Sequence, residues 1–67
     1  MSNDNLVKMA NQIAHYFDSE PDREKAVQGV RLHLQNFWTP AMRRQLGAWV
    51  EAHGGEGLDS KVREALT

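Results

Sequence analysis

The sequence has 67 residues, with 8 basic and 9 acidic side chains and a formal net charge of −1. A chain of this length forms one domain at most, and such small domains usually need a disulfide, a metal ion or a partner for comfortable stability. Cysteine is absent, which excludes a disulfide framework and a thiolate metal site. The near-neutral charge argues against a general attraction to nucleic acid or to an anionic membrane.

The sequence predicts no targeting signal and no membrane segment. No apolar run approaches the roughly 20 residues that a membrane span needs. Residues 1–4 lack the basic and apolar regions of a signal peptide. We therefore expect a cytoplasmic protein with no membrane partner.

A first helix is predicted from Asn3 or Asp4, either of which can cap it, to about Asp18. Its apolar residues recur at the spacing of one helical face. They are Leu6, Met9, Ala10, Ile13 and Phe17. The polar residues Asn11 and Gln12 could serve either a partner interface or contacts between helices.

A second helix is predicted to begin near Pro21, which fits a first helical turn, and to end at about Asn36. One apolar face is formed by Val27, Val30, Leu34 and Phe37. Gly29 lies beside this face and could let the first helix approach closely. Leu32 points away from it, among polar residues.

The Thr39-Pro40 pair begins a third helix, because threonine can cap and proline suits the first helical position. Gly54-Gly55 ends it, and a short fourth helix follows from Asp59 or Ser60 to Leu66. The pattern predicts an all-α fold of one domain over residues 1–67, a small bundle of three helices plus a short C-terminal fourth helix.

Residues 36–44 form a corner between the second and third helices, and this corner carries the strongest sign of an interface. We expect Phe17, Phe37, Leu34, Leu46 and Trp49 to supply the core. The side chains left over are Trp38, Tyr16 and Leu32, with Arg43 and Arg44 beside the corner. Tryptophan, tyrosine and arginine are enriched at interface hot spots, so these five residues are predicted to contact a partner. The alternative, that Trp38 caps the core, is equally open.

The sequence gives little indication of a catalytic or metal-binding site. The three serines are predicted to lie at the terminus or at helix caps. His15 and Asp18 have a spacing that two metal ligands on one helix can have, but the sequence offers no second pair of ligands to complete a metal site. We expect no catalytic, cofactor-binding or metal-binding residues. The alternatives to a partner subunit are a helix-turn-helix-like DNA-binding regulator, with Arg43 and Arg44 opening the recognition helix, and a free-standing homo-oligomer.

Three segments resemble the delta subunit of soluble NAD-dependent formate dehydrogenases that contain molybdenum or tungsten. They are residues 9–13 (MANQI), residues 33–43 (HLQNFWTPAMR) and the helix end at residues 52–55 (AHGG). The resemblance spans nearly the whole chain. It departs from the family pattern at Ala41, where a basic residue is common, and at Ala14, where glycine is common.

The resemblance implies a non-catalytic accessory subunit of a complex that oxidises formate to CO2 and reduces NAD. Its partners would be the large molybdopterin-containing alpha subunit, with beta and gamma subunits. The complex would carry molybdopterin guanine dinucleotide with Mo or W, iron–sulfur clusters, FMN and NAD, none of them bound by this chain. The delta subunit would support assembly, stability or molybdenum-cofactor loading of the alpha subunit.

Overall fold

The computed structural model of the protein describes residues 2–67 and contains four α-helices in that range. Their bounds are Asn3–Tyr16 for α1, Arg23–Phe37 for α2, Pro40–His53 for α3 and Ser60–Ala65 for α4. No strand occurs in the described part of the chain, so the predicted all-α class is confirmed. None of the described helices is long and apolar enough to span a membrane.

Each helix begins at a side-chain cap. Asp22 caps α2 through the amides of the second and third following residues, and Thr39 caps α3 through the amide of Met42 at 3.2 Å. Asp59 caps α4. The cap of α1 is Ser2 rather than the predicted Asn3 or Asp4, and Pro21 precedes the cap of α2 instead of lying in its first turn. These are shifts of one or two residues at helix ends.

The connection between α3 and α4 is made by glycines in the left-handed conformation. Gly54 ends α3 with a φ of 72°, and Gly55 and Gly57 follow with φ values of 74° and 87°. Residues with a Cβ adopt this conformation only at an energetic cost. The predicted helix stop is therefore confirmed.

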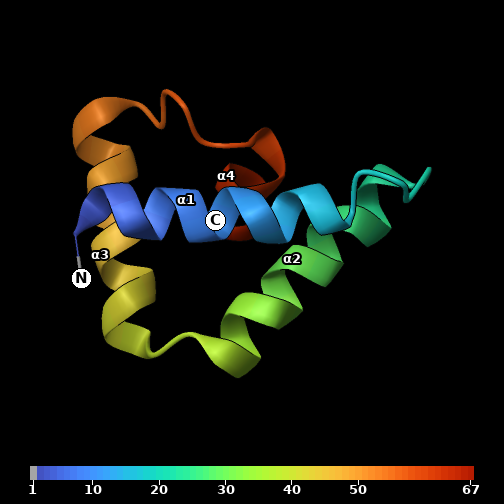
Figure 1. Ribbon diagram of the computed structural model, residues 1–67, viewed down its shortest axis with the longest axis horizontal. Coiled ribbons are helices and arrows are strands. Elements are labelled where there is room, and N and C mark those ends of the chain that lie inside the picture. Colours follow the sequence, from blue (N-terminus) through green and yellow to red (C-terminus); the bar gives the residue numbers. More distant parts are fainter. Residues whose placement is uncertain (1) are drawn as a thin grey trace.

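Helix α1 crosses one side of the molecule, while α2 and α3 diverge from their corner in a V and α4 lies behind α1 (Figure 1). Helix α4 packs chiefly on α2, and α1 contacts each of the other three helices. The buried apolar residues form one core with contributions from all four helices. They are Leu6, Ala10, Ala14, Val27, Val30, Leu34, Trp38, Leu46, Leu58, Val62 and Ala65.

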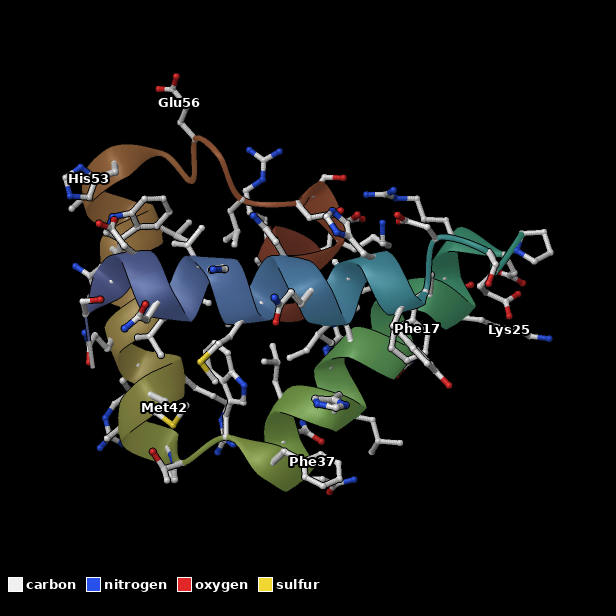
Figure 2. All side chains as sticks on the ribbon, in the orientation of Figure 1. Phe17, Lys25, Phe37, Met42, His53 and Glu56 are labelled. Carbon is white, nitrogen blue, oxygen red and sulfur yellow. The ribbon has the colours of Figure 1, made fainter. Side chains whose placement is uncertain are left out.

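Helices α1 and α2 approach closely where Phe17 covers Gly29. A Cβ atom added at Gly29 would lie 2.4 Å from a ring carbon of Phe17, too close for any real contact. The predicted role of Gly29 is therefore confirmed, and the ring of Phe17 is the group that needs the space. Figure 2 shows Phe17 beside α2.

Candidate partner-binding surface

An open groove lies between α1, α2 and α3, on one side of the α2–α3 corner. Its volume is about 730 Å³. Most of its lining is aromatic or aliphatic. The lining residues are Met9, Gln12, Ile13, Tyr16, Phe17, His33, Phe37, Trp38 and Met42. We refer to this set as the aromatic groove; Figure 2 labels Phe17, Phe37 and Met42 around it.

Two aromatic rings stand exposed at the groove. The exposed fraction is 79% for Tyr16 and 72% for Phe37. Tyr16 meets the ring of Phe17 edge to face with centroids 5.1 Å apart, and Phe37 lies 4.7 Å from the imidazole of His33. These contacts hold both rings in place while leaving most of their apolar surface in water. Such rings can be buried by a partner at low entropic cost.

Trp38 forms part of the groove's lining but is only 5% exposed. Of the two alternatives left open for Trp38, the structure supports the one in which it packs in the core, whereas the expectation that Phe37 belongs to the core is wrong. Relative to the interface prediction, the two residues exchange roles. Phe37 is the last residue of α2, at the end where α2 has diverged from α1 (Figure 1), and its side chain is 72% exposed. Trp38 leaves the helix in an extended conformation, with φ −99° and ψ 143°, and joins the core.

A second depression, lined by three arginines, lies on the other side of the same corner. Its volume is about 510 Å³. Its lining comes from α2, from the first half of α3, and from the end of α4 with the two residues that follow it. The residues are Arg31, Leu34, Gln35, Pro40, Arg43, Arg44, Gly47, Ala65, Leu66 and Thr67. We refer to this set as the arginine pocket.

The predicted interface residues fall into three places. Tyr16 and Trp38 lie in the aromatic groove, and Arg43 and Arg44 lie in the arginine pocket. Leu32 is 58% exposed, as predicted, but lines neither depression. Sequence reasoning missed Phe37 and Arg31. The position of Phe37 in the last turn of its helix could have indicated its exposure, because neighbouring helices often do not extend over the apolar face at the end of a helix.

Arg43 has a structural role that the sequence did not reveal. One of its terminal nitrogens, Nη1, donates to the backbone carbonyls of Leu34 at 3.0 Å, Gln35 at 3.4 Å and Trp38 at 2.8 Å. These carbonyls lie at the C-terminal end of α2, where intrahelical partners run out. Arg43 thus fastens α3 to the end of α2 across the corner.

Asn11 is committed to an internal contact, which resolves one of the alternatives left open by the sequence. Its amide nitrogen donates to the carbonyl of Gly57 at 2.9 Å, and its Oδ1 accepts from the amide of Asp59 at 2.8 Å. Gln12 instead lies exposed at the aromatic groove. Asn11 therefore orders the segment before α4, while Gln12 remains available to a partner.

The titratable groups do not assemble into a metal site within residues 2–67. No group of three or more His, Cys, Asp or Glu side chains comes together there as metal ligands. Asp18 pairs with Lys61 at 2.7 Å rather than with His15. The groups with displaced pKa values are Asp59 and Lys61, and they lie outside both the aromatic groove and the arginine pocket.

Comparison with protein families gives a match to nearly the whole chain. The model of the family described as NADH-dependent formate dehydrogenase delta subunit, FdsD, matches residues 5–66. Comparisons with curated proteins and with solved structures give no match. The matched range includes α2, α3, α4 and the whole lining of the aromatic groove.

Proposed function

The chain belongs to the family of NADH-dependent formate dehydrogenase delta subunits, and we propose that it is a non-catalytic accessory subunit whose aromatic groove binds the large alpha subunit of that enzyme. The observation that carries this proposal is the pair of exposed rings, Tyr16 and Phe37, at an open apolar groove. Large apolar surface left in water on a small domain typically marks a protein interface.

The proposed role is to support assembly, stability or molybdenum-cofactor loading of the alpha subunit in the cytoplasm. We assign formate oxidation to CO2 and the reduction of NAD to the other subunits. They would hold molybdopterin guanine dinucleotide with Mo or W, iron–sulfur clusters and FMN. This chain would contribute by binding the alpha subunit through a preformed groove, whose side chains need little reordering when the two subunits associate.

The test is co-purification of the complex with Phe37→Ser. Phe37 packs on His33 at the surface rather than in the core, so the substitution should leave the fold intact. We expect the affinity for the alpha subunit to fall about tenfold or more, the loss typical of an aromatic hot spot. Unchanged affinity for both Phe37→Ser and Tyr16→Ser would refute the groove as the interface.

Two controls sharpen this experiment. Lys25→Ala changes an exposed residue of the same helix that points away from the groove (Figure 2), and it should have no effect. Leu32→Ala measures whether the interface extends beyond the groove over the outer side of α2. Light scattering on the isolated chain tests self-association, and a stable homodimer that buries the groove and excludes the alpha subunit would contradict the proposal.

The same preparation distinguishes the possible roles. If the chain stabilises the alpha subunit, Phe37→Ser lowers the yield of that subunit while its molybdenum content per subunit stays constant. If the chain supports cofactor loading, the yield holds and the molybdenum content falls. In both cases the turnover of formate per molybdenum atom should match the wild type, because no residue of this chain would take part in the reaction.

A further inference from the structure

The arginine pocket joins Arg31 to two neighbouring cations, Arg43 and Arg44, that follow at least twelve residues later in the sequence. Arg31 comes from the middle of α2, and Arg43 and Arg44 come from the first turns of α3. No carboxylate side chain lines the pocket. In a chain with a net charge of −1, this is a local excess of positive charge.

Part of the donor capacity of these arginines is already used. Arg31 donates from Nε to the carbonyl of Ala65 at 3.3 Å and from Nη2 to the carbonyl of Glu64 at 3.1 Å. Arg43 donates from Nη1 to backbone carbonyls at the end of α2. These bonds orient the guanidinium groups and leave Nη1 of Arg31, and Nε and Nη2 of Arg43, without a partner within residues 2–67.

Arg44 makes no hydrogen bond or ion pair within the described part of the chain, and its side chain is exposed. Each helix end carries about half an elementary charge, negative at the C-terminus and positive at the N-terminus. The ends of α2 and α4 therefore offset about one of the three positive charges. The start of α3, at Pro40, adds about half a positive charge, and a backbone carboxylate at Thr67, which also lines the pocket, would offset about one, so a positive excess remains.

The geometry points to a binding site for carboxylate groups, and we infer that the arginine pocket receives an acidic segment of the alpha subunit. The unused nitrogens offer the planar, forked donors that match carboxylates. The corner at residues 37–44 contributes to both depressions, because Trp38 and Met42 line the aromatic groove while Pro40 and Arg43 line the arginine pocket. A segment that crosses the corner can therefore contact both. The choice of the alpha subunit as the source rests on the proposed function.

The experiment measures the affinity of the full chain for the alpha subunit at increasing salt concentrations. Arg44→Gln removes the unpaired cation without disturbing the bonds that hold the fold. We expect about tenfold weaker binding at low salt and a shallower salt dependence, because a rim charge acts mainly through screened electrostatics. Lys25→Gln makes the same change of charge on an exposed side chain that lines neither the arginine pocket nor the aromatic groove, and it should change the affinity less than twofold.

The two proposals fail in different ways. If Arg44→Gln matches Lys25→Gln in affinity and salt dependence while Phe37→Ser weakens binding, the carboxylate site is wrong and the groove interface stands. If Arg44→Gln, Phe37→Ser and Tyr16→Ser all leave binding unchanged, the groove interface fails as well. A 20-base-pair DNA duplex is the second probe. Binding of the duplex that depends on Arg44, with no such dependence for the alpha subunit, would overturn the inference in favour of nucleic acid.

Discussion

Phe37 and Trp38 are adjacent residues with opposite surroundings. The indole of Trp38 is 5% exposed and packs in the core, whereas the ring of Phe37 is 72% exposed and rests on His33. The difference comes from the backbone, because α2 ends between them. Trp38 therefore contributes mainly to stability, and Phe37 is free to contribute to binding.

Truncating the buried ring should be far more destabilising than truncating the exposed one. We expect Trp38→Ala to lower the free energy of unfolding by about 3–5 kcal/mol, the cost of a large core cavity. Phe37→Ala should lower it by only about 0.5 kcal/mol. Urea unfolding followed by circular dichroism measures both.

The loss expected for Trp38→Ala approaches the whole stability of a domain this small, so we expect a substantial unfolded fraction of that variant even without urea. Trp38→Phe is the milder variant, with an expected loss of about 1–3 kcal/mol. Equal stabilities for Trp38→Phe and Phe37→Ala would contradict the exchange of roles between the two positions.

At the scale of the elements, α4 depends on contacts with its neighbours. It spans only Ser60–Ala65, too short for a helix that is stable alone. Arg23 on α2 pairs with Glu64 and donates to Ser60 at 2.8 Å. Asn11 on α1 holds the loop that leads into α4 through Gly57 and Asp59. The short helix is thus fastened at its start and along one side.

Removing the side chain of Asn11 should loosen α4 and the loop before it. Asn11→Ala leaves the amide of Asp59 and the carbonyl of Gly57 without partners, and we expect a loss of about 1–3 kcal/mol. Hydrogen exchange at the Asp59 amide should accelerate more than exchange in the middle of α2. Gln12→Ala, at the exposed neighbour, is the control, and equal effects of the two substitutions would exclude a structural role for Asn11.

For the whole molecule, one network of charges joins the α1–α2 connection to α4. The ammonium of Lys61 lies 2.7 Å from an Asp18 oxygen and 3.2 Å from Oδ1 of Asp59, and the Lys61 side chain is only 11% exposed. The hydrogen bond to Asp18 raises the pKa of Lys61 above its usual 10.5, against the opposing effect of burial. Burial acts to raise the pKa of Asp59, but hydrogen bonds from the Lys61 amide and ammonium outweigh it and hold that pKa below 3.8.

These directions define the pH range over which the network stabilises the fold. The contribution of Asp59 is present above its usual pKa of 3.8 and is lost as pH falls through its lower folded value. The contribution of Lys61 is present below its usual pKa of 10.5 and is lost as pH rises through its higher folded value. The network is therefore complete at neutral pH and fails at both extremes.

Lys61→Met tests this range. At pH 7 we expect it to lower the free energy of unfolding by about 1–2 kcal/mol, between the values typical of exposed and of buried ion pairs. The difference from wild type should shrink below about pH 4 and above about pH 11, where one partner loses its charge. Lys25→Met is the matched control on an exposed lysine. A difference that stays constant from about pH 2 to about pH 12 would show that Lys61 acts through packing alone.

The sequence by itself determined the helices, because their signals are local. Asp22, Thr39, Asp59 and the glycines after α3 act within a few residues along the chain, and each begins or ends a helix within two residues of its predicted position. The close approach at Gly29 and the outward position of Leu32 also followed from helical periodicity. The resemblance to the delta-subunit family followed from three short segments, and the family match over residues 5–66 confirms it.

Only the tertiary structure decided which side chains the helices cover. The divergence of α2 from α1 exposes Phe37, and the extended conformation after α2 buries Trp38. The corner between α2 and α3 places Arg31 in one depression with Arg43 and Arg44, which are twelve or more residues away, and the packing of α4 on α2 adds residues 65–67 to the same lining. Periodicity gives the face on which a residue lies, but burial depends on whether another helix reaches that face. The aromatic groove and the arginine pocket are products of that arrangement.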